Sequence, residues 1–351
     1  MNITEIRKMI GHGRTVQPAF SYELERTPQG KVTRKIEHTP YGKREYRYSY
    51  DESGHLTEVY CGGKLLEKYS YNDIGQRVSA WVAHQNREIQ YIYGYDGALI
   101  AVDDARLGWT RSGQLESVTT HASRTEYRYG DDSRLDAAYL SDGTVVQYQY
   151  GSGLMPERVL ADYEPVFEYS WSNDILLQRC IDVADKVGYE FSYREGRFPY
   201  SVTVTGPADM LQRLTGRYAQ SLELRLLGDQ VDSVRALVAP DGSLVRYLEY
   251  DAFGNLICDT RPDWQFPLGF ACGLDDLFTG FVRFGYRDYD PWVGRFTCKD
   301  PLGDTGGDHD LWDYCVDDPV SMNDPTGLIA PFLLLAMGAA GALSLGLTGS
   351  Y

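Results

Sequence analysis

The sequence predicts an all-β protein built from repeated hairpins that join into one long, curved antiparallel sheet. The first observation is composition: of 351 residues, 28 are Tyr, against 12 Phe and 6 Trp. Tyrosine combines an apolar ring with a polar hydroxyl and favours strands. The second observation is that 36 residues are Gly, as expected of a chain with many tight turns. The third observation is an internal repeat.

Each copy of the repeat begins with an aromatic residue, continues with polar residues and has a Gly four positions later. The clearest copies are YDESGHL (50–56), YNDIGQR (71–77), WTRSGQL (109–115) and YDAFGNL (250–256). Looser copies begin at Tyr93, Tyr129, Tyr150, Trp171 and Tyr193. Most steps between neighbouring copies are 20 to 22 residues, and one step is 16 residues. A fixed period of this kind indicates a repeat architecture.

One repeat has the pattern of a β-hairpin. The stretches EYRYSYD (45–51), TEYRYGD (125–131) and VQYQYG (146–151) alternate tyrosine with polar residues, which is typical of strands with one buried face. The Asp or Asn and the Gly that follow supply the turn. A single hairpin is marginal in water, so we expect the hairpins to pair edge to edge, with tyrosine ladders across the sheet. We assign residues 41–226 to this sheet and 1–40 to a lead-in.

The repeats resemble the YD repeats of the Rhs family, which occurs in bacterial polymorphic toxins, in the C components of Tc toxins and in the teneurins. Residues 227–328 carry a stronger resemblance, because they are similar to the family's Rhs repeat-associated core over almost their whole length. The matching pieces are 227–256, 266–307 and 310–328. The departures are Asp232 in place of the usual Gly, Asp310 in place of Asn, and Asp317–Asp318 in place of Asn-Asn.

The resemblance implies a structural function in toxin encapsulation and delivery. In the family, the repeat sheet spirals into a hollow cocoon, the core forms a plug, and the segment after the core is a toxin that is cleaved but kept inside. The implied partners are a C-terminal toxin segment, an immunity protein and the tip proteins of a secretion system such as type VI secretion. About nine hairpins precede the core here. We therefore expect an open, curved sheet unless other chains complete the shell, as in a shortened or orphan family member.

The resemblance also implies an intramolecular aspartic-type protease that cuts between Leu328 and Ile329, after the D-P-x-G-L motif. Aspartic-type hydrolysis needs two carboxylates that share a proton, one to activate water and one to donate to the carbonyl oxygen. Tethering the bond within the same chain supplies a high effective concentration. An active protease would split the chain into two pieces after Leu328.

The resemblance identifies Asp300 as the first candidate carboxylate, because it is the Asp of the first D-P element. Lys299 matches the basic residue that directly precedes this Asp in the Tc-toxin C components. Two residues remain open as the second carboxylate: Asp313, which aligns with the second catalytic Asp of those components, and Asp324 of the terminal D-P-x-G. Arg295 is a candidate for neutralising nearby carboxylates.

Asp-Pro-x-Gly is also a good turn sequence, because Asp caps the turn, Pro fixes φ and Gly adopts positive φ. The D-P elements at Asp300 and Asp324 therefore have a purely structural interpretation beside the catalytic one. The histidines form no arrangement with Ser, Asp or a metal-ligand partner in the sequence.

Residues 329–351 are too few for a folded toxin domain. Within them, 329–347 carries no charge, and as a helix it would approach the thickness of a bilayer core. Three interpretations remain open for this apolar tail: the start of a truncated toxin region, a segment packed inside the shell, or a membrane segment.

The formal net charge of −16 argues against nucleic-acid binding, which needs a basic surface. The six cysteines form no C-x-x-C pair and have no His at zinc-ligand spacing, so we predict no metal site, and no cofactor is implied. The N-terminal residues lack the apolar stretch of a secretion signal. We expect a cytoplasmic protein with reduced thiols, or one exported by a contact-dependent secretion system.

Two other functions fit the sequence. Tyrosine-rich sheet faces could hold a carbohydrate or a partner protein, which would make the chain a binding module. A degenerate orphan Rhs element without activity is the other alternative.

Overall fold

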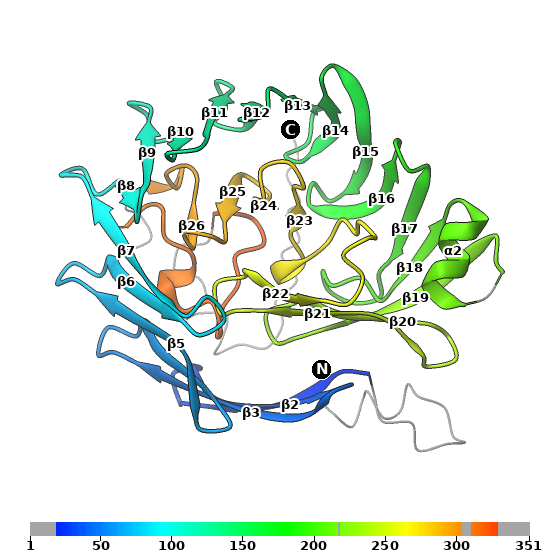
Figure 1. Cartoon of the computed structure of the whole chain (residues 1–351), viewed down its shortest axis with the longest axis horizontal. Coiled ribbons are helices and arrows are strands. Elements are labelled where there is room, and N and C mark those ends of the chain that lie inside the picture. Colours follow the sequence, from blue (N-terminus) through cyan, green and yellow to red (C-terminus); the bar gives the residue numbers. More distant parts are fainter. Residues whose placement is uncertain (1–18, 217, 304–309, 329–351) are drawn as a thin grey trace, which may run out of the picture.

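The computed structural model describes residues 19–216, 218–303 and 310–328. Its main feature is an antiparallel sheet of 22 strands, which curves around a second sheet of four short strands (Figure 1). The prediction of an all-β protein with one long, curved antiparallel sheet is confirmed.

The first half of the main sheet runs from the N-terminal strands to the middle of the repeats. Its strands are β1 (Ser21–Arg26), β2 (Val32–Thr39), β3 (Gly42–Tyr50), β4 (Leu56–Cys61), β5 (Lys64–Tyr71), β6 (Arg77–Val82), β7 (Arg87–Tyr93), β8 (Leu99–Val102), β9 (Ala105–Trp109), β10 (Leu115–Thr119) and β11 (Arg124–Tyr129).

The second half completes the repeats and continues into residues 227–328, the segment that resembles the repeat-associated core. Its strands are β12 (Leu135–Tyr139), β13 (Val145–Tyr150), β14 (Pro156–Ala161), β15 (Glu164–Ser172), β16 (Leu176–Asp182), β17 (Val187–Ser192), β18 (Ser201–Thr205), β19 (Ser221–Gly228), β20 (Val234–Val238), β21 (Leu244–Tyr250) and β22 (Leu256–Asp259).

The small sheet consists of β23 (Leu274–Asp275), β24 (Val282–Phe284), β25 (Arg287–Asp290) and β26 (Arg295–Phe296). The described helices are α2 (Ala208–Thr215) and the short 3₁₀ turns η1 (Phe270–Cys272) and η3 (Cys315–Asp317). In the described part of the chain, no helix combines the length and the apolar character needed to cross a membrane. The apolar tail 329–351 lies outside the described residues.

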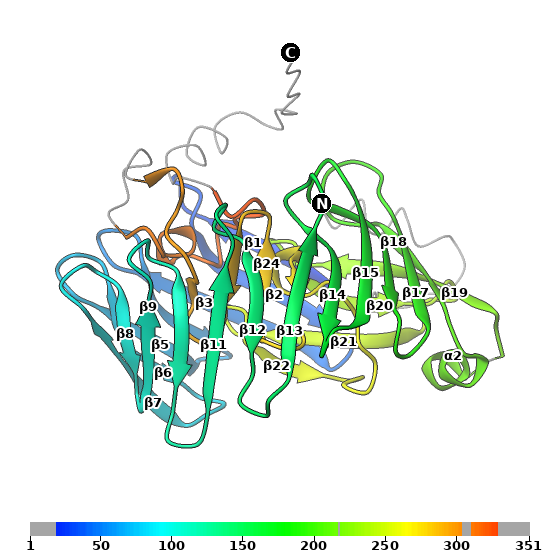
Figure 2. The ribbon, with the colours of Figure 1, turned by 90° about the horizontal axis from the view of Figure 1, so that it is seen from above.

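Each strand of the main sheet pairs with the strands just before and after it in the chain, from β1 to β22. Figure 2 shows these strands side by side as a continuous wall. The sheet starts at Ser21, within the range assigned to the lead-in. Among the described residues, no ladder joins β1 to β22, so the sheet remains open.

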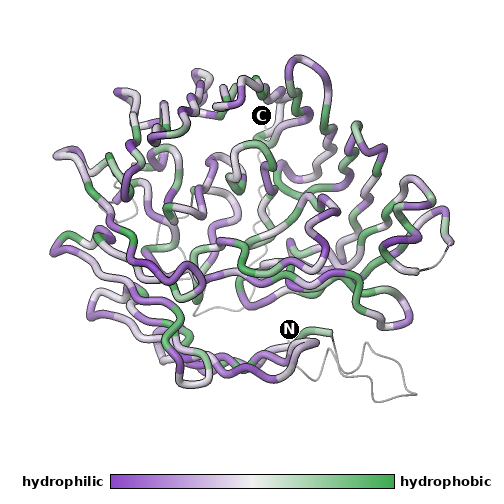
Figure 3. The backbone as a smooth tube through the Cα atoms, in the orientation of Figure 1, coloured by the Kyte–Doolittle hydropathy of each residue, from purple (hydrophilic) through white to green (hydrophobic). Residues whose placement is uncertain are grey.

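The residues along the wall strands alternate between hydrophobic and hydrophilic (Figure 3). Tyrosines of the repeats lie on the predicted buried face, together with Leu, Val and Ala side chains. The buried tyrosines are Tyr46, Tyr48, Tyr69, Tyr91, Tyr127, Tyr148, Tyr169 and Tyr189. These rings pack in the protein core and do not form an exposed face.

The repeat turns share one hydrogen-bond pattern and one backbone requirement. In the turn after β3, the Asp51 amide donates to the His55 carbonyl (3.1 Å) and the Gly54 amide donates back to Asp51 (3.1 Å). Gly54 has a φ of 93°, which explains the Gly four positions after the aromatic. Asp232, which stands where the family usually has Gly, occupies the same position with a φ of 66°. Asp is one of the few other residues that tolerate this conformation.

The wall surrounds the described residues of the segment 264–328, namely 264–303 and 310–328, which contain the small sheet (Figures 1 and 2). Main-chain and side-chain bonds tie this segment to the wall. The Leu115 amide donates to the Thr297 carbonyl (2.7 Å), and the Trp312 indole donates to the Gly113 carbonyl (3.0 Å). Near the C-terminal end of the segment, the Asp318 carboxylate pairs with Lys31 (2.9 Å). We call residues 264–328 the plug segment.

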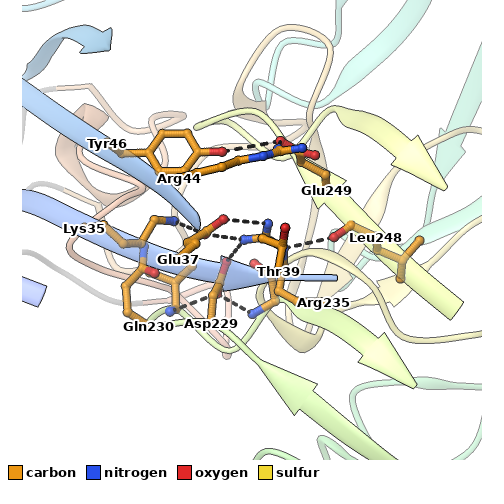
Figure 4. A network of polar contacts seen from close by, with 12 residues as sticks. Lys35, Glu37, Thr39, Arg44, Tyr46, Asp229, Gln230, Arg235, Leu248 and Glu249 are labelled. Carbon is orange, nitrogen blue, oxygen red and sulfur yellow. Dashed lines mark hydrogen bonds and ion pairs between the residues drawn. The ribbon is translucent and has the colours of Figure 1, made fainter. Parts of the chain in front are cut away.

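Two far-apart portions of the main sheet meet through a network of charged side chains (Figure 4). Arg235 on β20 holds the carboxylate of Glu37 on β2 through two contacts of 2.8 and 3.2 Å. Lys35 adds a third contact to Glu37 (2.7 Å), and all three side chains are buried. Beside them, Arg44 on β3 pairs with Glu249 on β21. Side-chain contacts therefore join strands near the two ends of the sheet, which no β-ladder joins among the described residues.

Candidate functional site

The buried guanidinium of Arg287 on β25 brings two of the predicted carboxylates together. Its Nη2 atom lies 2.8 Å from Oδ2 of Asp300 and 3.3 Å from Oδ2 of Asp324. Its Nε atom donates to the carbonyl oxygen of Gly327 at 2.5 Å, and Nη1 donates to the Leu311 carbonyl at 3.2 Å. The two D-P elements, far apart in sequence, thus meet at one cation.

Both D-P elements also form the turns that their sequence predicts. Oδ1 of Asp300 accepts a hydrogen bond from the Leu302 amide at 2.8 Å. Oδ1 of Asp324 accepts from the Leu328 amide at 3.2 Å. In each carboxylate, one oxygen therefore caps the local turn and the other faces Arg287. Each of the two aspartates therefore caps its turn and pairs with Arg287 at the same time.

The turn that carries Leu328 is fixed against the β24–β25 hairpin. The Tyr286 amide donates to the Thr326 carbonyl at 2.9 Å. Gly327 has a φ of 65°, and a Cβ added to it would lie 2.4 Å from the Phe284 carbonyl oxygen. No larger residue fits there without a shift of the main chain. The end of the plug segment is consequently held rigidly next to Arg287.

The other predicted site residues take different positions. Arg295 forms an ion pair with Asp310, one of the residues that departs from the family pattern. The Lys299 ammonium lies 4.9 Å from the centre of the Trp312 ring, and its amide donates to the Gly113 carbonyl at 3.3 Å. Asp313 is positioned by its main chain, which forms a β-bridge with Arg295.

Sequence reasoning missed Arg287 and named Arg295 as the neutralising cation. The available signal was the R-x-Y-D-P element of the core motif, which contains Arg287. That motif contains no clue to its partners, because Arg287 reaches Asp300 and Asp324 only through the folded plug segment. A buried arginine does require such carboxylates to offset its charge.

This arrangement differs from the proton-sharing pair expected of an aspartic protease. A guanidinium that contacts both carboxylates offsets the charge of both. The Asp300 side chain is 14% exposed, whereas that of Asp324 is 3% exposed. Asp300 is therefore the carboxylate that water reaches more readily. The guanidinium beside the Gly327 carbonyl is suited to stabilising negative charge on a neighbouring oxygen.

Cys298, two residues before Asp300, is the nearest alternative nucleophile in the sequence. Burial raises the pKa of its thiol to about 12. A thiol must ionise to act as a nucleophile, so Cys298 is inert at neutral pH. Ile329, the second residue of the predicted scissile bond, lies outside the described residues.

Comparison with known proteins identifies one matching family model, the teneurin YD-shell, over residues 217–308. Teneurin-3 of Danio rerio is 25% identical over 296 residues, which cover 77% of this chain and 10% of that protein. Teneurin-m of Drosophila melanogaster is 26% identical over 294 residues, which cover 81% of this chain and 9% of that protein. The chain thus spans about a tenth of the length of these relatives.

Two solved structures are also similar in parts. A crystal structure of TcdB2-TccC3 has a TM-score of 0.47 and 15% identity, covering 88% of this chain and 19% of that chain. The Tc holotoxin pore of Photorhabdus luminescens has a TM-score of 0.48 and 16% identity, covering 89% of this chain and 18% of that chain.

The hairpin repeat, the single curved sheet and the matches to the YD-shell model and the teneurins agree with one another. The chain is therefore similar to the YD-repeat shells of these proteins, and its described residues form a stretch of curved wall around the plug segment.

Proposed function

We propose that this chain is a structural shell element that cleaves its own Leu328–Ile329 bond. The observation that carries the proposal is the contact of one guanidinium, Arg287, with Asp300, Asp324 and the Gly327 carbonyl. This contact places both D-P elements and the end of the plug segment at one point. The Leu328 amide is itself bonded to Asp324, so the residue before the bond is held beside that carboxylate.

The reaction we propose is hydrolysis within the chain. Asp300 takes a proton from water, which adds to the Leu328 carbonyl carbon, and Arg287 stabilises the negative charge that develops on the oxygen. The proton then passes to the departing nitrogen of Ile329, which leaves as an amine while Leu328 becomes a carboxylate. Asp324 holds the turn in place through the Leu328 amide. Asp313 is the alternative second carboxylate.

Separate asparagine variants of Asp300, Asp324 and Asp313 test these roles. We expect Asp300→Asn to slow cleavage by at least about a hundredfold, the usual contribution of a positioned acid or base. Asp324→Asn should also slow it, because a neutral side chain no longer pairs with Arg287. A purified time course followed by intact mass spectrometry gives the rates.

Asp142→Asn is the matched control. Asp142 caps a repeat turn in the wall through the Thr144 amide (2.9 Å), so the variant perturbs a similar turn far from the plug segment in sequence. It should cleave at the wild-type rate. Loss of cleavage in Asp313→Asn but not in Asp324→Asn would assign the second carboxylate to Asp313. Normal cleavage in Asp300→Asn would refute the proposed base.

We further propose that the residues after Leu328 begin a cargo segment that the shell retains after the cut, as in a toxin carrier linked to a secretion system. The similarity of residues 217–308 to the teneurin YD-shell supports this proposal. Native mass spectrometry should then show shell and C-terminal piece together, whereas denaturing conditions should separate them. Release of the piece under native conditions would contradict retention.

A further inference from the structure

A cavity of about 420 Å³ lies between the end of the main sheet and the small sheet. Its walls come from β21 and β22, from the turn between them, and from the segments before and after β24. Most of the lining is apolar and aromatic, and three acidic side chains interrupt it, those of Asp275, Asp276 and Asp290. The residues that matter here are Phe266, Phe270, Phe281, Trp292, Asp275 and Asp290. Leu256 and Leu277, at its rim, are exposed, so the cavity is open to solvent there.

Two of these carboxyl groups, those of Asp275 and Asp290, have few partners within the protein. Asp290 is only 7% exposed, and its carboxyl accepts a main-chain hydrogen bond from Trp292 (2.9 Å). Asp275 packs against Gly269, where an added Cβ would lie 2.2 Å from its Oδ2. Within the described residues, no side chain donates a hydrogen bond to either carboxyl. The Asp290 carboxylate is buried without such a partner, which is costly, and a bound cation would offset that cost.

The neighbouring arginine is already paired with another carboxylate. Arg246 also lines the cavity, but Asp259 holds its guanidinium through two contacts of 3.0 and 2.7 Å. Asp276 accepts hydrogen bonds from the Tyr148 hydroxyl and from the Phe278 amide. Burial raises the pKa of both Asp275 and Asp290 to about 7. The charge of Arg246 lowers the pKa of Asp275, and the charge of Asp276 raises it. Hydrogen bonds from main-chain amides lower the pKa of Asp290.

The lining indicates which kind of cation fits. A divalent metal ion prefers six or more oxygen ligands, and a cavity dominated by aromatic rings does not provide them. An organic ammonium ion needs opposite charge for its head and apolar surface for its hydrocarbon part, and aromatic rings attract such cations further. We propose that this cavity binds a small organic ammonium ion, with its head at Asp275 and Asp290 and its hydrocarbon part against the aromatic lining.

Isothermal titration of the full chain with 2-phenylethylammonium chloride at pH 8 tests this site. The neutral isostere 2-phenylethanol is the matched ligand control. Because charge-assisted contacts carry the recognition, we expect the ammonium to bind at least about tenfold more tightly than the alcohol. At pH 5.5, where both carboxyls are protonated, this preference should disappear. Equal binding of the two ligands at pH 8, or no binding of the ammonium, would overturn the proposal.

Two variants locate the site. Asp290→Asn should weaken ammonium binding by about tenfold. Asp263→Asn, at an exposed position outside the cavity lining, should leave the affinity unchanged. Circular dichroism establishes that each variant is folded. If Asp290→Asn does not fold, the comparison of ammonium with alcohol on the wild-type chain still decides. Unchanged affinity in a folded Asp290→Asn chain refutes the assignment of the head group.

Discussion

At the residue scale, the aromatic that opens most repeats acts as a hydrogen-bond donor to a main-chain carbonyl. The Tyr71 hydroxyl donates to the Leu56 carbonyl at 2.7 Å, and the Tyr150 hydroxyl donates to the Leu135 carbonyl at 2.8 Å. Where the repeat has Trp in place of Tyr, the indole does the same: Trp171 donates to the Pro156 carbonyl at 2.7 Å. Tyr50, Tyr93, Trp109 and Tyr193 repeat the contact. This role explains why these positions carry Tyr or Trp and not Phe.

Replacing Tyr71 with Phe should therefore lower the free energy of unfolding by about 1 kcal/mol, because the Leu56 carbonyl loses its side-chain donor. Tyr129→Phe is the matched control, since the Tyr129 hydroxyl does not reach a main-chain carbonyl. Urea titration of both variants measures the difference. An equal loss in both would show that the hydroxyl contact is not the cause.

At the element scale, the sheet curves because most repeats contain a β-bulge at the same place. The register shifts between Ser49 and Tyr50, between Ser70 and Tyr71, and equivalently at later repeat aromatics. A bulge bends its strand and increases the local twist. Repetition of the bulge along the wall turns a flat ladder into a curl around the plug segment (Figure 1).

The turn glycines provide a test at this scale. Gly143 has a φ of 95°, and a Cβ added there would meet no atom within 4 Å, so Gly143→Ala changes only the backbone cost. We expect a loss of about 1 to 2 kcal/mol in the free energy of unfolding. Gly153→Ala is the control, because Gly153 has no positive φ and its added Cβ makes an ordinary contact of 3.4 Å. Similar stability of both variants would contradict the backbone explanation.

The sequence predicted the structure where a single residue type satisfies a local requirement of backbone conformation or burial. Turn glycines and alternating tyrosines predicted the hairpins, because φ and burial are local properties. The bulges escaped prediction, since they depend on how neighbouring strands pair. The small sheet also escaped it, because its strands of two to four residues are too short to show alternation. Helix α2 was not predicted from the sequence, although Pro207 before it and Gly216 after it are typical helix boundaries. Gly216 ends the helix with a φ of 72°.

The same limit applies to the site. Asp300 and Asp324 could be predicted, because each lies in a recognisable D-P-x-G element. Their common partner Arg287 could not, because that contact exists only once the plug segment has folded. Arg295 is nearer to Asp300 in sequence and was the more obvious cation, yet it pairs with Asp310.

At the scale of the whole molecule, buried ionisable side chains join the early strands of the wall to its last strands. One is the network of Glu37 and Arg235 shown in Figure 4. Another is Glu67 on β5, whose carboxyl accepts a hydrogen bond from the Ala252 amide in the turn after β21. Burial, together with the nearby Asp251, raises the pKa of Glu67 to about 8. The folded protein therefore holds a proton there that the unfolded chain releases at lower pH.

This linkage has a definite sign. The contribution of Glu67 to stability is fully present below the pKa of the unfolded chain and is lost as pH rises towards about 8. Glu67→Gln stays neutral, so it should raise the thermal midpoint relative to the wild type more at pH 8 than at pH 5. Exposed Glu116→Gln should show no such difference between the two pH values. A larger relative gain at pH 5 would contradict a raised pKa at Glu67.

We propose that this folded wall presents the end of its plug segment for cleavage at Leu328. The intact mass of the purified wild-type chain under denaturing conditions tests that claim most directly. We predict two species, one ending at Leu328 and one beginning at Ile329, with the latter confirmed by N-terminal sequencing. A single species with the full-length mass, after prolonged incubation of folded protein, would contradict the claim.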